Sequence, residues 1–409
     1  MNRQPARSAA SEFRTGWKVV LAAAVGAAVT GAHFHVTGTM MKPLSAAYGW
    51  SRGDIGLAVT VATIAMALFH VPVGILVDRW GPKRVLVPGV VLFGLGAALF
   101  GFAGPELWTW FAAYTVFSIL LVPTAAFVWF AAVVRHFKTA LGFALSLCLA
   151  GSAILTAITP AIILALVSHY GVRGTYFVLA AGSVALMLPF ALWAVPGRAG
   201  NEAGEAEHGQ VLDRRQRNRI LGDFLFWKLA LVVLCISVAI GTYSVHYQSM
   251  LTDSGLTPGG AAAVALYLAP SMIVSALGSG AMLDRFDPRI PAALIFLLPG
   301  ITAALLFGYS GDPVRGAAIG LLLGATFGAP VSVISFLAGY YFEPHHFGFV
   351  SSAYFGVLGV AIGLGSWLAG LLFDISHDYS STYVLMIVTG VAAAGLILSI
   401  RRRNEPMAA

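Results

Sequence analysis

The chain has 409 residues, of which 58% are hydrophobic and only 10% are charged, and it carries a net charge of +7. Its mean hydropathy is +0.84, and soluble globular proteins carry about 25% charged residues. This composition excludes a water-soluble globular fold and indicates a chain that is mostly surrounded by lipid. The two cysteines, Cys148 and Cys235, lie inside apolar runs and provide neither a disulfide framework nor a metal-ligand spacing.

Charged residues divide the chain into long uncharged runs, each at least 21 residues long. An α-helix needs about 20 apolar residues to cross the hydrocarbon core of a bilayer. The strands of a membrane β-barrel would be about ten residues long with strict alternation, which the runs do not show. We therefore expect an all-α membrane protein with twelve transmembrane helices, over 19–41, 55–77, 85–105, 107–134, 139–172, 174–197, 229–252, 254–283, 290–311, 316–342, 344–373 and 379–400.

The orientation of these helices follows from lysine and arginine, which accumulate on the cytoplasmic side of membrane proteins. With the N-terminus in the cytoplasm, 20 of the 24 Lys and Arg residues fall on that side, and the other side holds Lys42, Arg52, Arg173 and Arg315. The basic net charge thus reflects topology and contact with anionic lipids, and no nucleic-acid partner is expected. We expect a multi-pass protein of the plasma (inner) membrane of a bacterium, with both termini cytoplasmic and tails over 1–17 and 401–409.

One polar stretch, 196–225, interrupts the series of apolar runs. It is rich in charged residues, glycine and alanine, which predicts a cytoplasmic linker whose later part forms a short surface helix. The linker separates a six-helix bundle over 18–195 from a second one over 226–400. The halves share a repeat at an offset of 206 residues, because "GILVDRWGPKR" (74–84) corresponds to "GAMLDRFDPRI" (280–290). Internal symmetry of this kind is typical of secondary transporters.

The loop after the second predicted helix, "GILVDRWGPKRV", resembles the signature loop of the major facilitator superfamily. Four further stretches are similar to the monocarboxylate and oxalate/formate antiporter branch of that superfamily: "KPLSAAYGWSRGDIGLAV" (42–59), "VVRHFKTALGFALS" (133–146), "HYGVRGTYFVL" (169–179) and "LAGLLFDISHDYSSTYVL" (368–385). The resemblance implies the major facilitator fold, in which two pseudo-symmetric six-helix bundles open a shared site alternately to the two sides of the membrane.

The signature loop and its repeat also predict gating residues. Asp78 ends the second predicted helix, where a carboxylate can accept hydrogen bonds from free N–H groups at a neighbouring helix N-terminus. In the family that the chain resembles, this aspartate docks on the start of the eleventh helix and closes the cytoplasmic side. The expected gating set is Asp78, Arg79, Arg84, Asp284 and Arg285. A loop that only fixes topology would explain the basic residues but not the repeated aspartate.

The twelve predicted helices contain no Asp, Glu, Lys or Arg. In a transporter, a buried basic residue commonly marks an anion site and a buried carboxylate a proton relay. The monocarboxylate branch commonly carries an arginine in the eighth helix, which this chain lacks. The titratable groups that remain are His33, His35, His70 and His246, and histidine is the side chain that changes charge near neutral pH. Each of them could equally make only an interhelical hydrogen bond.

His33 and His35 lie two positions apart in the first predicted helix. Residues i and i+2 of an α-helix point about 200° apart, so these two side chains cannot both face one cavity. The register of the family that the chain resembles places the functional position of this helix about two turns before Lys42, at His35. His33 is then expected to make a packing hydrogen bond.

The seventh predicted helix is the counterpart of the first, and it carries an aromatic stripe. Tyr243, His246, Tyr247 and Met250 are spaced i, i+3, i+4 and i+7, which places them on one face. We expect His35 and His246 to be the proton-coupling groups and to meet the substrate from opposite halves. The complete predicted substrate-binding set is His35, Tyr243, His246, Tyr247, Tyr267 and Tyr354, although packing alone would satisfy each tyrosine.

These features predict a secondary transporter of a small organic anion, a monocarboxylate, coupled to a proton or working by exchange. The alternative is a proton-coupled exporter of amphipathic or uncharged molecules, which an uncharged aromatic cavity would suit. An enzyme is not expected, because no nucleotide-binding loop, metal cluster or catalytic-triad spacing appears. No cofactor or metal is expected. The expected partners are the small-molecule substrate, a proton and membrane lipids, and the chain is expected to act as a monomer.

Overall fold

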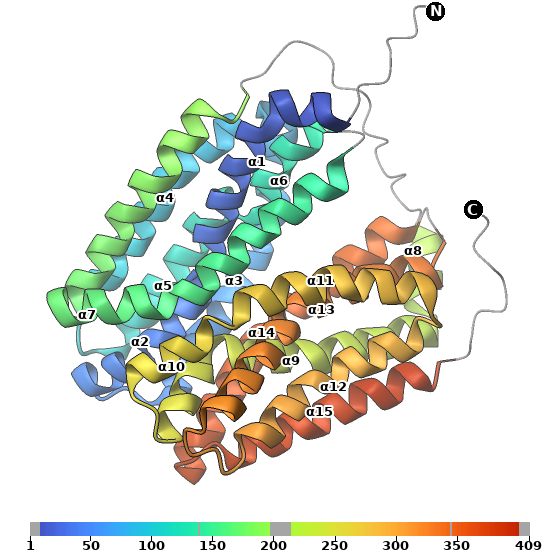
Figure 1. Cartoon of the computed structure of the whole chain (residues 1–409). Helices are drawn as coiled ribbons and strands as arrows, with labels where there is room; N and C mark the ends of the chain where they lie inside the picture. The colour runs from blue at the N-terminus through green and yellow to red at the C-terminus, as the bar shows by residue number, and fades with distance from the viewer. Residues whose placement is uncertain (1–8, 138–139, 197–213, 344–345, 401–409) are drawn as a thin grey trace, which may run out of the picture. The chain divides into compact units, whose positions relative to one another are not determined.

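The computed structural model describes residues 9–137, 140–196, 214–343 and 346–400, and within these ranges all regular structure is helical (Figure 1). The chain forms two compact units. The first unit comprises 1–50 and 61–202, and the second comprises 51–60 and 203–409. The first residues of one helix, 51–60, therefore belong to the second unit although they precede most of the first unit in the chain.

The first unit is a bundle in which α1 and α4 lie along the long helix α7, with α6 beside α1 (Figure 1). Its elements are α1 (Ala9–Gly31), α2 (His33–Tyr48), the part of α3 (Arg52–Trp80) from Val61 on, α4 (Pro82–Phe102), α5 (Leu107–Leu121), the 3₁₀ turn η1 (Val122–Thr124), α6 (Ala126–His136) and α7 (Leu141–Trp193).

The second unit is a bundle in which α14 packs along α9, α11 along α13, and α12 along α15. Its elements are the start of α3, α8 (Arg214–Leu221), α9 (Phe224–Asp253), α10 (Pro258–Ala265), α11 (Leu268–Arg285), α12 (Arg289–Leu306), α13 (Pro313–Tyr341), α14 (Phe347–Ser376) and α15 (Ser380–Leu398).

Eleven segments of the described residues are long and apolar enough to cross a membrane. One of them, Phe143–Trp193, has 51 residues, which at about 1.5 Å per residue is more than twice the hydrocarbon thickness of roughly 30 Å. Gly171 interrupts it with φ 65° and ψ −175°, a conformation that glycine adopts without a Cβ penalty. The segment thus contains two spans, and the predicted all-α protein with twelve membrane helices is confirmed.

The fourth span is broken at Pro123, where η1 separates α5 from α6. Irregular backbone at membrane depth must find hydrogen-bond partners within the protein. The carbonyl oxygen of Thr124 accepts from the Thr30 hydroxyl at 2.8 Å and from the Trp129 indole at 3.0 Å. The break is therefore satisfied by neighbouring side chains, and it fastens α1 to this position of the bundle.

Glycines allow α14 to lie unusually close to α9. A Cβ atom built on Gly365 would lie 2.0 Å from the carbonyl oxygen of Val238, and one built on Gly241 would lie 1.9 Å from that of Ile362. The Thr242 hydroxyl donates to the carbonyl oxygen of Gly365 at 2.9 Å. Small residues and hydroxyl groups of this kind hold membrane helices together where lipid removes the hydrophobic drive for association.

The start of α3 contacts α14 in the same way. A Cβ atom on Gly370 would lie 2.4 Å from the carbonyl oxygen of Arg52, and one on Gly56 would lie 2.6 Å from that of Ser366. The Thr60 hydroxyl donates to the carbonyl oxygen of Gly363 at 2.8 Å. Helix α14 therefore packs closely against both α9 and the start of α3. This packing explains why 51–60 group with the second unit.

The ends of the predicted domains differ in detail from the structure. The predicted tail over 1–17 is helical from Ala9 on, and Glu12 is buried, with its carboxylate accepting the backbone N–H of Ala140 at 3.1 Å. Within the predicted linker over 196–225, α8 supplies a short helix and α9 begins at Phe224. Residues 197–213 and 401–409 lie outside the described part of the chain.

Replacing Gly365 by Ala should destabilise the fold, because the added methyl group meets the backbone of α9. Overpacking of this kind costs about 1–3 kcal/mol, which exceeds the gain of roughly 1 kcal/mol from better helix propensity. The thermal unfolding midpoint of the purified Gly365→Ala protein should fall by several degrees.

The matched control is Gly359→Ala in the same helix, where an added Cβ has no heavy atom within 4 Å. This variant should unfold at the native temperature or slightly above it. Equal midpoints for the two variants would contradict the close packing of α14 on α9.

Candidate functional site

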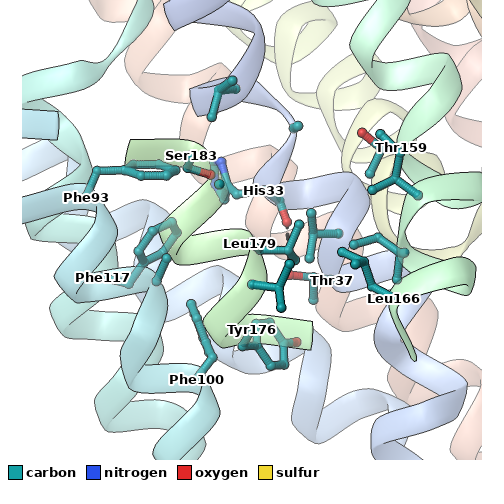
Figure 2. A pocket seen from close by; sticks show the side chains of 18 of the residues that line it. His33, Thr37, Phe93, Phe100, Phe117, Thr159, Leu166, Tyr176, Leu179 and Ser183 are labelled. Carbon is teal, nitrogen blue, oxygen red and sulfur yellow. Dashed lines mark hydrogen bonds between the residues drawn. The ribbon is translucent and has the colours of Figure 1, made fainter. Parts of the chain in front are cut away.

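A cavity of about 350 Å³ lies inside the first unit, between α2, α4, α5 and the two parts of α7 (Figure 2). Its walls are mostly apolar. Rings of four different helices form one side, and those labelled in Figure 2 are His33, Phe93, Phe100, Phe117 and Tyr176. The ring centroids of Phe100 and Tyr176 lie 5.2 Å apart, as do those of Phe100 and Phe117. This pocket can accommodate a small organic molecule.

The polar groups of the pocket are hydroxyls and one imidazole. His33 Nδ1 lies 2.7 Å from the carbonyl oxygen of Thr30, in the preceding turn. The Thr37 and Tyr114 hydroxyls are hydrogen-bonded at 2.6 Å. His35, which the sequence predicts to face the substrate, is 8% exposed and does not line the pocket.

His246, the other predicted proton-coupling group, is completely buried within the second unit. Its Nε2 lies 2.9 Å from the carbonyl oxygen of Ser366, and its Nδ1 lies 2.9 Å from the Tyr379 hydroxyl. A carbonyl oxygen can only accept, so Nε2 carries the proton and the Tyr379 hydroxyl donates to Nδ1. Both ring nitrogens of the neutral imidazole are thereby satisfied.

The Tyr379 hydroxyl connects His246 to a charged cluster at the start of α3. Arg52 donates from one terminal nitrogen to Asp253 Oδ2 at 2.6 Å and to the Tyr379 hydroxyl at 2.8 Å. The guanidinium group also stacks on the Phe373 ring, 3.6 Å from its centroid. A phenol keeps its proton at neutral pH, so the Tyr379 hydroxyl is available as a donor toward His246.

Asp374, near the end of α14, completes this cluster by capping α3. Its two carboxylate oxygens accept the backbone N–H groups of Arg52 at 3.1 Å and Gly53 at 2.7 Å. A carboxylate at a helix N-terminus satisfies free N–H groups and interacts favourably with the helix dipole. The first ten residues of this unit, 51–60, are thus fastened by a cap, an ion pair and close glycine packing.

The predicted tyrosines lie at separate places in the second unit. The Tyr243 and Tyr354 hydroxyls donate to the carbonyl oxygens of Pro299 at 2.8 Å and Phe226 at 3.2 Å. Tyr247 is completely buried, whereas Tyr267 precedes α11 and is 45% exposed. Bonds from Tyr243 and Tyr354 to helix backbones are what packing requires, and the substrate role of all four tyrosines stays a prediction.

The predicted gating residues lie at the ends of α3 and α11 and at the start of α4. The side chain of Asp78 lies outside the described part of the structure, and the side chains of Arg79, Arg84, Asp284 and Arg285 are exposed. Gly81 has a φ of 82°, so the turn of the first copy requires glycine.

The second copy of this turn is built differently, because Asp287 occupies the position of Gly81. Its carboxylate forms a two-pronged ion pair with Arg289, with contacts of 2.6 Å and 3.0 Å. Arg289 also donates to the carbonyl oxygen of Ile400 at 2.8 Å. The second copy therefore joins the start of α12 to the end of α15.

Sequence reasoning missed the cluster of Arg52, Asp253, Asp374 and Tyr379. Each residue stands at the end of an apolar run, and alternation of the helices places all four on one side of the membrane. That signal was present, but no spacing in the sequence indicates that they touch. No group of three or more His, Cys, Asp and Glu residues suited to a metal ion occurs among the residues that the structure describes.

Comparison with known proteins identifies a matching family and a similar protein. The family model of the Major Facilitator Superfamily matches residues 23–355. Monocarboxylate transporter 13 of Bos taurus is 26% identical over 406 residues, which cover 94% of this chain and 89% of that protein.

Solved structures of several transporters share the fold. The nucleoside transporter NupG, in a mutant form, aligns with a TM-score of 0.76 and 12% identity, over 94% of this chain and 99% of that one. A bacterial homolog of the human lysosomal transporter Spinster, in an inward-facing and occupied conformation, aligns with a TM-score of 0.73 and 13% identity, over 93% of this chain and 95% of that one. The D-xylose–proton symporter aligns with a TM-score of 0.70 and 15% identity, over 94% of this chain and 97% of that one.

The cap on α3 can be tested through Asp374→Asn, which keeps the shape of the side chain and removes its charge. Loss of a charged N-terminal cap costs about 1 kcal/mol, so the thermal unfolding midpoint should fall by a few degrees. The measurement is thermal unfolding of the purified protein.

The control for this variant is Glu106→Gln, an exposed carboxylate at the start of α5 whose side chain caps no helix. It should leave the midpoint unchanged. A native midpoint for Asp374→Asn would show that the charge of this cap and its second hydrogen bond to α3 add no stability.

Proposed function

We propose a substrate for this chain, which belongs to the major facilitator superfamily. The proposed substrate is a small organic anion, a monocarboxylate. Transport is coupled to a proton or proceeds by exchange, through alternating access. The observation that best supports this substrate class is the 26% identity with monocarboxylate transporter 13, across 94% of this chain. The similarity of the fold to a proton symporter supports the coupling.

The two predicted proton-coupling groups, His35 and His246, supply the positive charge that the membrane-spanning residues otherwise lack. A histidine that gains a proton attracts a carboxylate, so substrate binding weakens as pH rises through the histidine pKa. For His246 the added proton goes to Nδ1, where the Tyr379 hydroxyl now donates. Protonation therefore reverses this hydrogen bond, so that the Tyr379 hydroxyl accepts from His246 as well as from Arg52, which links proton binding to the contacts of Arg52.

Gating involves two sets of residues in this proposal. The first set acts at the cytoplasmic ends of α3 and α11 and at the start of α4, and it comprises Asp78, Arg79, Arg84, Asp284 and Arg285. On the opposite side, the contacts of Asp374 and Arg52 hold 51–60 on the second unit and must be released for that side to open. Hydrogen bonds and ion pairs at a surface of this kind are each worth only about 1 kcal/mol, so such a set is reversible.

The setting of this function follows from the charge pattern. We infer a plasma (inner) membrane location in a bacterium, with both termini in the cytoplasm, because 20 of 24 basic residues then lie on that side. The basic residues at the helix ends contact anionic lipid headgroups. The chain acts as a monomer, and no cofactor takes part.

The proposed coupling predicts the behaviour of the double variant His35→Ala/His246→Ala. Uptake of a monocarboxylate into proteoliposomes should fall at least about tenfold, since losing one charge-assisted hydrogen bond costs roughly 1.5–3 kcal/mol. The control is His169→Ala, because His169 is exposed at the end of an apolar run. Equal uptake by the double variant and the native chain would refute the role of both histidines.

A second candidate function is export of amphipathic or uncharged molecules, coupled to protons. The lining of the cavity in the first unit favours it, because that lining contains no Lys, Arg, Asp or Glu. Expression in a drug-sensitive host distinguishes the two functions. Raised resistance to apolar drugs, without uptake of organic acids, would favour export and contradict the monocarboxylate proposal.

A further inference from the structure

The wall of the cavity in the first unit contains a buried hydroxyl group without a partner among the described residues. Tyr176 is 4% exposed and lines the pocket, and its hydroxyl has no hydrogen-bond partner among the residues that the structure describes. Its ring is held by Phe100, at a centroid distance of 5.2 Å. A buried hydroxyl without a partner is unfavourable, and a ligand that supplies the partner recovers that free energy.

His33 presents the complementary group in the same pocket. Its Nδ1 lies 2.7 Å from the Thr30 carbonyl oxygen, which can only accept, so Nδ1 carries the proton. The neutral imidazole then leaves Nε2 as a hydrogen-bond acceptor, and no hydrogen bond to Nε2 is present within the described ranges. Figure 2 shows His33 and Tyr176 on the lining of one hollow, with Leu179 between them in this view.

Within the part of the chain that the structure describes, no charged side chain lines this pocket. Its titratable groups are His33 from α2, Tyr114 from α5 and Tyr176 from the second part of α7, and Tyr114 is already bonded to Thr37. The lining residues from α1, α4 and the first part of α7 include no titratable side chain. A carboxylate bound here would be an unpaired charge in an apolar site, which is strongly unfavourable.

We propose that the pocket binds the transported acid in its protonated, uncharged form. The acid O–H donates to His33 Nε2, the acid carbonyl oxygen accepts from the Tyr176 hydroxyl, and the apolar body lies among Phe93, Phe100 and Phe117. This inference rests on the proposed function, since it takes a monocarboxylic acid as the ligand. No pocket side chain changes its charge when the acid binds, because the acid brings its own proton, and the proposed proton-coupling groups His35 and His246 are not among the lining residues.

Binding of phenylacetic acid and its uncharged amide, phenylacetamide, to the purified full chain tests the proposal. An ordinary carboxyl group has a pKa of about 4, so the apparent affinity for the acid should fall about tenfold per pH unit from about pH 5 to about pH 8. Affinity for the amide should change less than about twofold over the same range. Acid binding that is independent of pH, or tighter at about pH 8, would overturn the proposal.

Two variants with matched controls locate the binding site. Tyr176→Phe removes only the hydroxyl and should weaken amide binding about fivefold, the effect of one hydrogen bond. Leu179→Trp fills the cavity and should abolish binding. The controls are Tyr170→Phe and Leu192→Trp, on exposed positions of the same helix. Native affinity in both Tyr176→Phe and Leu179→Trp, at native unfolding temperatures, overturns the assignment of the pocket.

Uptake into proteoliposomes separates this inference from the proposed function. Saturable monocarboxylate uptake that is unchanged in Leu179→Trp overturns the pocket and leaves the proposed function standing. Amide binding that is lost in Leu179→Trp, together with no monocarboxylate uptake by the native chain, contradicts the proposed function and supports a pocket for uncharged ligands.

Discussion

The hydrocarbon core of a membrane offers no hydrogen-bond partners, and this constraint acts on the polar groups of the membrane-spanning segments. Backbone groups are satisfied within helices. Where a helix breaks, as at η1, the carbonyl oxygen of Thr124 is satisfied by the side chains of Thr30 and Trp129. The same rule explains His246, whose ring nitrogens both find partners, and the serine and threonine hydroxyls that bond to helix carbonyls.

Charged groups obey the same constraint by lying at helix ends. At the start of α3, the Arg52 side chain forms an ion pair with Asp253. The Asp374 carboxylate accepts a hydrogen bond from the backbone N–H of Arg52, where the helix dipole also favours a negative charge. In the membrane interior the chain relies on neutral contacts, which are backbone approaches at glycine and single hydrogen bonds. Each of these contacts is weak, and a set of weak contacts suits a protein whose function requires one packing arrangement to exchange for another.

Much of this architecture could be predicted from the sequence, because apolar runs between charges report directly on membrane spans. The two spans on either side of Gly171 were separated by Arg173 alone in the sequence, and the break itself coincides with a glycine. The helical positions of His33 and His35 indicate that only one of them can face a given cavity, and only His33 lines the pocket.

The sites were harder to predict, because they depend on contacts between residues far apart in the chain. Arg52 and Tyr379 are 327 positions apart. His33 and Tyr176 line one cavity, which no local pattern in the sequence indicates. Tyr176 lies within the stretch 169–179 that resembles the family, but nothing in that stretch indicates that its ring lines a cavity. Likewise, the hydroxyls of Tyr243 and Tyr354 bond to helix backbones, a use that the aromatic stripe did not distinguish from binding.

The most direct test of transport is uptake of labelled monocarboxylates by proteoliposomes that contain the purified chain, compared with protein-free vesicles. An organic-acid transporter coupled to protons or exchange should give saturable uptake, accelerated by an acidic exterior or by the same acid preloaded inside. Dicarboxylates and apolar drugs should compete poorly. Uptake equal to that of protein-free vesicles for every monocarboxylate tested, under both conditions, would contradict the account.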